Sequence, residues 1–189
     1  MNYIDISILA ISLTVILSGV YVNFQRKSDE GDKLKVASDK TLLIFRVAVP
    51  LSLVASVIFY FLGWGDMGVN ESIYIGYGLV VIGLTTRWYA IYSLGRSFQV
   101  NVTIMKGQQL MKEGIYKWVR HPSYSGLLLY YIGLGLVMHN YISLSILIIG
   151  PFFAVAMRIP KEESFLADHF GKEYLDYCQS SRRLIPFLY

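Results

Sequence analysis

Long apolar stretches alternate with short polar segments along this chain of 189 residues, and this alternation constrains its fold more than any other feature. A helix that crosses a bilayer needs about 20 mostly apolar residues. The stretches that meet or approach this length are residues 3–24, 41–63, 72–94, 123–138 and 141–157. Only 16% of the residues are charged, against about 25% in an average soluble domain. The sequence therefore predicts an all-α integral membrane protein with about five transmembrane helices, in a single membrane domain of residues 1–189.

The basic residues gather in segments that five membrane spans would place on one side of the membrane. Lys and Arg gather in residues 25–40, in residues 95–122 and in the C-terminal tail, whereas residues 1–5, 64–71 and 139–140 carry none. The positive-inside rule then places the N-terminus outside and the C-terminus in the cytoplasm. The sequence pI of about 9.1 is explained by this orientation, so no nucleic-acid partner is expected. The first stretch lacks a basic n-region and a small-x-small cleavage site, so it is expected to be a retained span and not a signal peptide.

Three arginines lie within or at the ends of the apolar stretches: Arg46, Arg87 and Arg158. Arg46 is expected to snorkel towards the headgroups. Arg87 lies deeper, about 10 Å from Leu94 at a helical rise of 1.5 Å per residue. Arg87 belongs to a polar cluster, TTRWY. Its side chain is about equally expected to line a cavity and to face lipid.

Two polar segments depart from what a lipid environment requires. Residues 94–124 form a long connector that ends in Arg120-His121-Pro122, and Pro122 suits the first turn of a helix. The positive end of that helix would favour an anionic ligand beside His121. Residues 157–171 contain Arg158, where the fifth stretch ends, and Pro160, where a new amphipathic helix is predicted to begin. In that case Glu162 and Glu163 lie in its first turn, where they could simply stabilise the helix start.

The sequence lacks the residues that several common kinds of active site and metal site require. A single cysteine, Cys178, excludes an intrachain disulfide and a cysteine-built metal site, and three histidines cannot build a His-rich di-iron centre, so no metal is expected. No P-loop, HExxH motif or GxGxxG fingerprint is present. The pairs Gly76/Gly78 and Gly133/Gly135 lie inside apolar stretches, where they predict close helix packing.

Three motifs carry a family resemblance. The runs GIYKWVRHPSYSG (residues 114–126) and RIPKEESFLADHFGKEYLDYCQSSRRLIP (residues 158–186), with TTRWYAIYSLGRSF (residues 85–98) before them, resemble the isoprenylcysteine carboxyl methyltransferase family. The resemblance covers residues 85–186, so residues 85–189 are expected to be the catalytic half. Residues 1–84, the N-terminal spans, carry no signature.

The resemblance implies a non-Rossmann methyltransferase that binds S-adenosylmethionine from the cytoplasm. The connector and the C-terminal amphipathic helix would form the cofactor pocket, and a lipophilic small-molecule or lipid acceptor would arrive from the bilayer. Arg158 would orient the acceptor carboxylate, with Arg87 as a second substrate-binding residue, and Arg158 and Glu163 would be the catalytic residues. The cofactor contacts that the resemblance implies are Asn101, Gln108, Gln109, Leu110, Met111, Tyr116, His121, Pro122, Ser123, Tyr124 and Glu163.

The expected reaction is O-methylation of an isoprenylcysteine-like carboxylate, which is already ionised at pH 7 and needs no general base. Three alternatives stay open. One is N- or S-methylation of phospholipid amines or thiols, which needs a base. Another is an NADPH-dependent membrane reductase related to sterol reductases, and the third is a non-catalytic membrane or assembly protein. A microbial plasma membrane is the expected location, with the endoplasmic reticulum as the alternative in a eukaryotic host.

Overall fold

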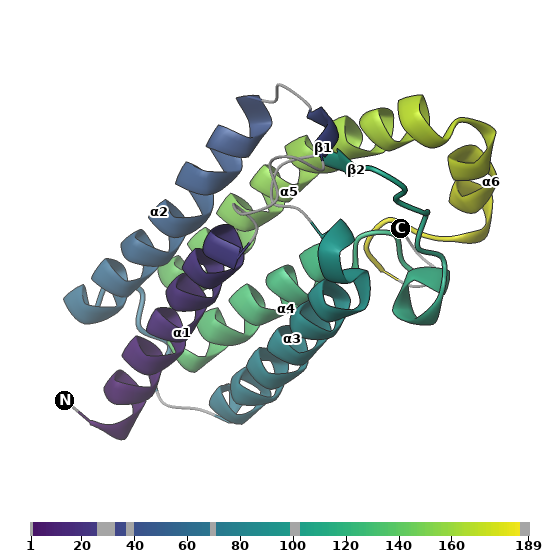
Figure 1. Cartoon of the computed structure of the whole chain (residues 1–189). Coiled ribbons are helices and arrows are strands. Elements are labelled where there is room, and N and C mark those ends of the chain that lie inside the picture. The colour runs from purple at the N-terminus through teal and green to yellow at the C-terminus, as the bar shows by residue number, and fades with distance from the viewer. Residues whose placement is uncertain (1, 26–32, 37–39, 69–70, 99–102, 186–189) are drawn as a thin grey trace.

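The structure is a computed structural model that describes residues 2–25, 33–36, 40–68, 71–98 and 103–185. Five long helices occupy the predicted apolar stretches, and a short sixth helix follows them (Figure 1). Their bounds are α1 Tyr3–Gln25, α2 Lys40–Leu62, α3 Ser72–Leu94, α4 Pro122–Val137, α5 Tyr141–Phe170 and α6 Lys172–Ser180. Two short 3₁₀ helices, η2 (Gly95–Ser97) and η3 (Gly114–Lys117), lie between α3 and α4. The helical membrane fold is thus confirmed.

Three of the described helices, α1, α2 and α5, are long and apolar enough to cross a membrane by length and composition. Helix α4 is apolar but shorter, and α3 carries Arg87 among its residues. Exposed aromatic side chains flank the bundle at both ends, as they do at the two interfaces of membrane proteins. They are Tyr3, Trp64, Tyr74 and Tyr141 at one end and Tyr21, Tyr89, Tyr92 and Trp118 at the other. The chain is therefore a multi-pass membrane protein, and the number of five spans stays a prediction.

Helices α3 and α4 lie side by side along their length because glycines face each other across the contact (Figure 1). A Cβ added at Gly76 would lie 2.7 Å from the Gly133 carbonyl oxygen, and one at Gly83 would lie 2.5 Å from the Tyr130 nitrogen. No side chain fits at such distances, so the two backbones touch. The predicted packing role is confirmed for Gly76 and Gly133, whereas a Cβ at Gly78 would meet nothing within 4 Å.

Helix α5 continues where the sequence predicted a break. The expected end at residue 157 and the new helix at Pro160 are wrong, because α5 runs unbroken through Pro151 and Pro160 to Phe170. A proline in a helix removes one hydrogen bond and crowds the preceding turn, but packing on both sides of it holds the helix here, since Ile159 and Phe165 are buried. The chain turns at Gly171 instead, whose φ of 55° is open to glycine, and α6 folds back (Figure 1).

The structure also contains a short antiparallel pair of strands, which the all-α prediction did not include. Strand β1 (Lys33–Val36) pairs with β2 (Thr103–Met105), with a bulge between Lys33 and Lys35. Ile104 of β2 is fully buried and packs with Phe165, Leu166 and Phe170 of α5. The pair therefore ties the segment between α1 and α2 to the connector that precedes α4.

Candidate active site

One cavity of about 450 Å³ lies where the connector, α6 and the ends of the long helices meet. Most of its lining falls into two sets, which we call the polar arm and the apolar arm. The polar arm is lined by Ser97, Phe98, Gln108, Gln109, Leu110, Met111, Tyr116, Arg120, His121, Glu162, Leu166, Phe170, Tyr174 and Tyr177. The apolar arm, from α1, α2 and α4, is lined by Val15, Ile16, Ser18, Gly19, Val20, Leu42, Phe45, Val49, Pro50, Leu53, Leu127 and Tyr131. The cavity thus joins a polar compartment to an apolar space between membrane helices.

Three arginines from different helices also line this cavity: Arg46 of α2, Arg87 of α3 and Arg158 of α5. The Nη1 of Arg87 donates to the Ser123 carbonyl at 3.2 Å and to its hydroxyl at 3.1 Å, across the close contact of α3 and α4. Arg158 is 2% exposed and interacts with the Tyr124 hydroxyl. The cavity wall therefore carries an excess of positive charge, which suits an anionic ligand group.

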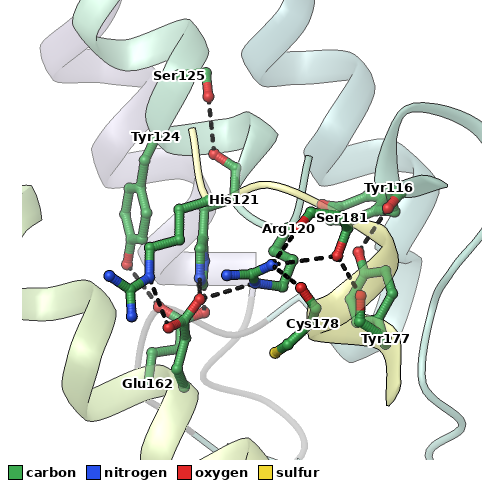
Figure 2. A network of polar contacts seen from close by, with 11 residues as sticks. Tyr116, Arg120, His121, Tyr124, Ser125, Glu162, Tyr177, Cys178 and Ser181 are labelled. Carbon is green, nitrogen blue, oxygen red and sulfur yellow. Dashed lines mark hydrogen bonds and ion pairs between the residues drawn. The ribbon is translucent and has the colours of Figure 1, made fainter. Parts of the chain in front are cut away.

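Tyr124 lies where the two arms meet. Its ring stacks on His121 with 5.8 Å between centroids, and it also contacts Phe45 of α2 at 5.8 Å. Its hydroxyl donates to Glu162 Oε2 at 2.9 Å, and Figure 2 shows Tyr124, His121 and Glu162 pointing toward one another. Tyr124 therefore connects Glu162 and Arg158 through its hydroxyl and forms part of the wall towards α2.

Glu163 does not line the cavity and instead holds three basic side chains behind its wall. Arg120 Nε and Arg183 Nε each lie 2.9 Å from its carboxylate, and His121 Nε2 lies 3.3 Å from it. Arg120 also donates to the Ser181 carbonyl at 2.6 Å and to the Cys178 carbonyl at 3.2 Å, at the C-terminal end of α6 (Figure 2). This network fixes the orientation of His121 at the start of α4.

The segment after α6, residues 181–185, runs along the end of the connector. The amides of Arg120 and His121 donate to the carbonyls of Arg182 and Arg183 at 2.7 and 3.0 Å. Further on, the Ser125 hydroxyl donates to the Leu184 carbonyl, and Leu184 is buried in the main hydrophobic core. The segment thus braces the Arg120-His121 corner from outside the cavity.

Three tyrosines enclose the polar arm. The Tyr177 hydroxyl donates to the Tyr116 carbonyl at 2.6 Å, as Figure 2 shows, and the Tyr116 hydroxyl donates to the Ala90 carbonyl at 3.1 Å. Burial raises the pKa of Tyr116 and of Tyr174 far above its ordinary value, and it raises the pKa of Tyr177 to about 12. All three therefore stay neutral at physiological pH and act as neutral hydrogen-bonding groups.

The structure brings most of the predicted site residues to this cavity. Those that line it are Gln108, Gln109, Leu110, Met111, Tyr116, His121, Pro122, Ser123, Tyr124, Arg87 and Arg158. Asn101 lies outside the described residues. Glu163 was expected at the cavity, but the glutamate that lines the wall is Glu162. On a continuous helix Glu162 follows Arg158 by four residues, nearly one turn, so the two share a face, whereas Glu163 follows Arg158 by five residues and does not. Sequence reasoning also missed Tyr174 and Tyr177, although their spacing of three places them on one face of a helix.

Among the described residues no group of three or more His, Cys, Asp or Glu side chains could hold a metal ion. The functional groups of the cavity are instead amides, hydroxyls, guanidinium groups, the His121 imidazole and one carboxylate. This donor set recognises a polar organic ligand that carries both signs of charge.

Comparison with known proteins gives consistent matches. Residues 76–168 match the family model of the isoprenylcysteine carboxyl methyltransferase (ICMT) family. A protein of Oryza sativa subsp. indica, named a probable protein-S-isoprenylcysteine O-methyltransferase, is 37% identical over 119 residues, which cover 61% of each chain. The Saccharomyces cerevisiae protein-S-isoprenylcysteine O-methyltransferase is 37% identical over 116 residues, 60% of this chain and 48% of the yeast protein. The chain thus spans about half to three fifths of the length of these relatives.

A solved structure shares the fold. The eukaryotic intramembrane Ras methyltransferase ICMT superimposes with a TM-score of 0.72 at 23% sequence identity, over 99% of this chain and 69% of that one. This likeness extends to α1 and α2, which precede the part of the chain that matches the family model.

Proposed function

Because residues 76–168 match the model of the isoprenylcysteine carboxyl methyltransferase family, we propose that the chain belongs to this family and transfers a methyl group from S-adenosylmethionine to a carboxylate. The acceptor is a lipophilic molecule in the membrane, an isoprenylcysteine or a chemically similar compound. The observation that carries the proposal is the single cavity that joins the polar arm to the apolar arm. A water-soluble donor and a membrane-soluble acceptor need such a junction.

The polar arm fits S-adenosylmethionine by its donor set. A volume of about 450 Å³ lies within the usual range of small-molecule sites. His121 and Arg120 would favour the carboxylate of the cofactor, and Glu162 would favour its amino or hydroxyl groups. Gln108, Gln109, Leu110, Met111, Tyr116, Pro122, Ser123 and Tyr124 complete the proposed contacts. When bound, the cofactor supplies an electrophilic methyl group on a sulfonium.

The apolar arm suits the hydrocarbon tail of the acceptor. Along α2 its lining extends from Leu42 to Leu53, which is about 16 Å at a rise of 1.5 Å per residue. That length is about half of the roughly 30 Å hydrocarbon core of a bilayer. An acceptor that lies in one leaflet could therefore place its tail in this arm and its head at the polar arm.

Arg158 is the residue we propose for the acceptor carboxylate. A guanidinium group can hold a carboxylate with two parallel hydrogen bonds, and Arg158 is buried at the wall where the arms meet. Arg87 adds positive charge to the same wall. The carboxylate is ionised at neutral pH, so these residues need to position it and exclude water but not remove a proton.

The proposal also concerns the arrangement of the whole chain. Residues 1–84 supply most of the apolar arm, and residues 85–189 form the catalytic half of one membrane domain. The sorting of Lys and Arg supports an N-terminus outside and a C-terminus in the cytoplasm. A microbial plasma membrane is the location we propose. The cofactor would then enter from the cytoplasm.

Two measurements on detergent-purified protein test the function. Calorimetry should show binding of S-adenosylhomocysteine and no binding of NADPH, with weaker binding to Glu162→Gln. A farnesylated N-acetylcysteine should then be methylated to a base-labile methyl ester, whereas its carboxamide should not react. Arg158→Lys should raise KM for this acceptor more than it lowers affinity for S-adenosylhomocysteine. Binding of NADPH alone, or a product stable to base, would refute carboxyl methylation.

A further inference from the structure

The function proposed above gives no task to Arg46 of α2, although Arg46 lines the cavity. Its helix is apolar, and the side chains of Leu43 and Val47 beside it are exposed, as residues that face lipid are. Arg46 follows the start of α2 at Lys40 by six residues, about 9 Å along the helix axis. A charged residue within such a helix is costly unless it reaches the headgroups or serves a site.

Arg46 belongs to the face of α2 that lines the cavity. Other residues of α2 in the cavity wall are Leu42, Phe45, Val49 and Leu53. They recur with Arg46 at the spacings of three and four residues that mark one side of a helix. Arg46 is also exposed, so it lies where the cavity opens to the surface of the protein. It therefore brings a positive charge to an open edge of the apolar arm.

The preceding residue on α2 shows how Arg46 lies relative to the junction of the two arms. The Phe45 ring packs on the Tyr124 ring with 5.8 Å between centroids, and the Tyr124 hydroxyl interacts with Arg158. The turn of α2 that carries Arg46 is therefore beside this junction. An acceptor whose tail occupies the apolar arm and whose carboxylate meets Arg158 has to pass that turn.

The two helices that supply most of the apolar arm leave room for entry from the bilayer. In the described part of the chain α2 packs along α5, whereas α1 and α2 have little direct contact with each other. Among the residues of α1 and α2 that line the cavity, Arg46 is the only charged one. An acceptor that enters between these helices therefore meets one positive charge in otherwise apolar surroundings, where a charge attracts its opposite more strongly than in water.

We propose that Arg46 selects acceptors for negative charge as they enter the cavity from the bilayer, before Arg158 orients the carboxylate for reaction. This inference rests on the proposed function and deepens it, since it assigns a specificity residue to the N-terminal spans. It predicts that the loss of Arg46 weakens binding of an anionic acceptor and leaves binding of a neutral analogue unchanged. An arginine that only reaches the headgroups would make no such distinction between the two ligands.

The experiment uses protein in bilayers of neutral phosphatidylcholine and two ligands with the same tail. Farnesylated N-acetylcysteine is the anionic acceptor, and its carboxamide is the neutral analogue, measured as an inhibitor. For Arg46→Gln we expect KM for the acceptor to rise about tenfold while kcat stays within about twofold of wild type. The inhibition constant of the carboxamide and the affinity for S-adenosylhomocysteine should not change.

Two further variants separate the charge of Arg46 from its shape and its place. Arg46→Lys keeps the charge but loses the planar fork of the guanidinium, so KM should rise less than in Arg46→Gln. The matched control is Lys40→Gln, which removes one positive charge from the same helix at a position outside the cavity wall. Its KM should equal that of wild type.

Each other outcome has a distinct meaning. If Arg46→Gln leaves KM unchanged, Arg46 does not contact the acceptor and the inference is overturned. If KM and the inhibition constant of the carboxamide rise together, Arg46 acts on the tail or on packing, and selection by charge is overturned. If wild type itself does not methylate the anionic acceptor, the proposed function fails and the inference fails with it, a result that is visible before any variant is compared.

Discussion

The contact between α3 and α4 gives a sharp test of the structure, because substituting a single glycine should separate the two helices. A Cβ at Gly83 would lie 2.5 Å from the Tyr130 nitrogen and 2.7 Å from the Gly126 carbonyl oxygen. Both are backbone atoms, which cannot rotate away as a side chain can. To reach even the 3.4 Å of an ordinary contact, α3 and α4 must move apart locally by 0.9 Å, the difference between 3.4 and 2.5 Å.

We expect Gly83→Ala to destabilise the protein by about 1–3 kcal/mol, the usual cost of overpacking. For a chain of this size, 1 kcal/mol corresponds to about 2–4 °C in Tm, so the expected loss is roughly 2–12 °C. The separation should also lengthen the 3.2 Å bond from Arg87 to the Ser123 carbonyl, which holds the cavity wall. Affinity for S-adenosylhomocysteine should therefore fall together with Tm.

The matched control is Gly78→Ala, on the same helix. An added Cβ there meets nothing within 4 Å, and alanine is the better helix former by about 0.5–1 kcal/mol. Thermal unfolding in detergent should thus show Gly78→Ala equal to or above wild type and Gly83→Ala below it. Equal Tm values for the two variants would refute the close approach of α3 and α4.

Three further predictions concern residues around the polar arm. Arg183→Ala should lower Tm by about 2–4 °C and weaken binding of S-adenosylhomocysteine, because the partly exposed ion pair between Arg183 and Glu163 contributes about 1 kcal/mol. The control Arg182→Ala should match wild type in both assays. Because burial raises the pKa of Cys178, a maleimide should label this thiol more slowly than free cysteine at pH 7, and the labelling rate should keep rising as the pH passes about 8.5. Labelling as fast as that of free cysteine would contradict the burial of Cys178. Tyr124→Phe keeps the ring between His121 and α2 but removes the bond to the α5 carboxylate, so kcat should fall about tenfold while Tm stays within a few degrees of wild type, as turnover and unfolding measurements can check.

The membrane fold could be predicted from the sequence because its determinants are local. Apolar length specified the five long helices, and the glycines at 76 and 133 indicated where two of them touch. The strands β1 and β2 could not be predicted in this way. Each has three or four residues, and their pairing joins segments about 70 residues apart, so no periodic pattern exists within either segment.

The site shows the same limit at the level of single residues. The motif around His121 identified the corner of the cavity, since that segment is contiguous in sequence. The apolar arm, however, is built by Phe45, Leu53 and Val15, which look like any other apolar residue of a membrane helix until α1, α2 and α4 are placed together. Residues of this kind acquire a role only through tertiary packing.

The assignment of the two glutamates depends on whether α5 is continuous. If a new helix began at Pro160, nothing would relate the faces of Glu162 and Glu163 to that of Arg158. Because α5 continues, Glu162 follows Arg158 by nearly one turn and shares its face on the cavity, whereas Glu163 is rotated by a further 100° or so towards Arg120 and Arg183. Adjacent carboxylates thereby take different tasks, since one can meet a ligand while the other holds the basic residues that shape the wall. The packing that carries the helix through Pro160 is thus what places Glu162 at the cavity and Glu163 among the basic residues.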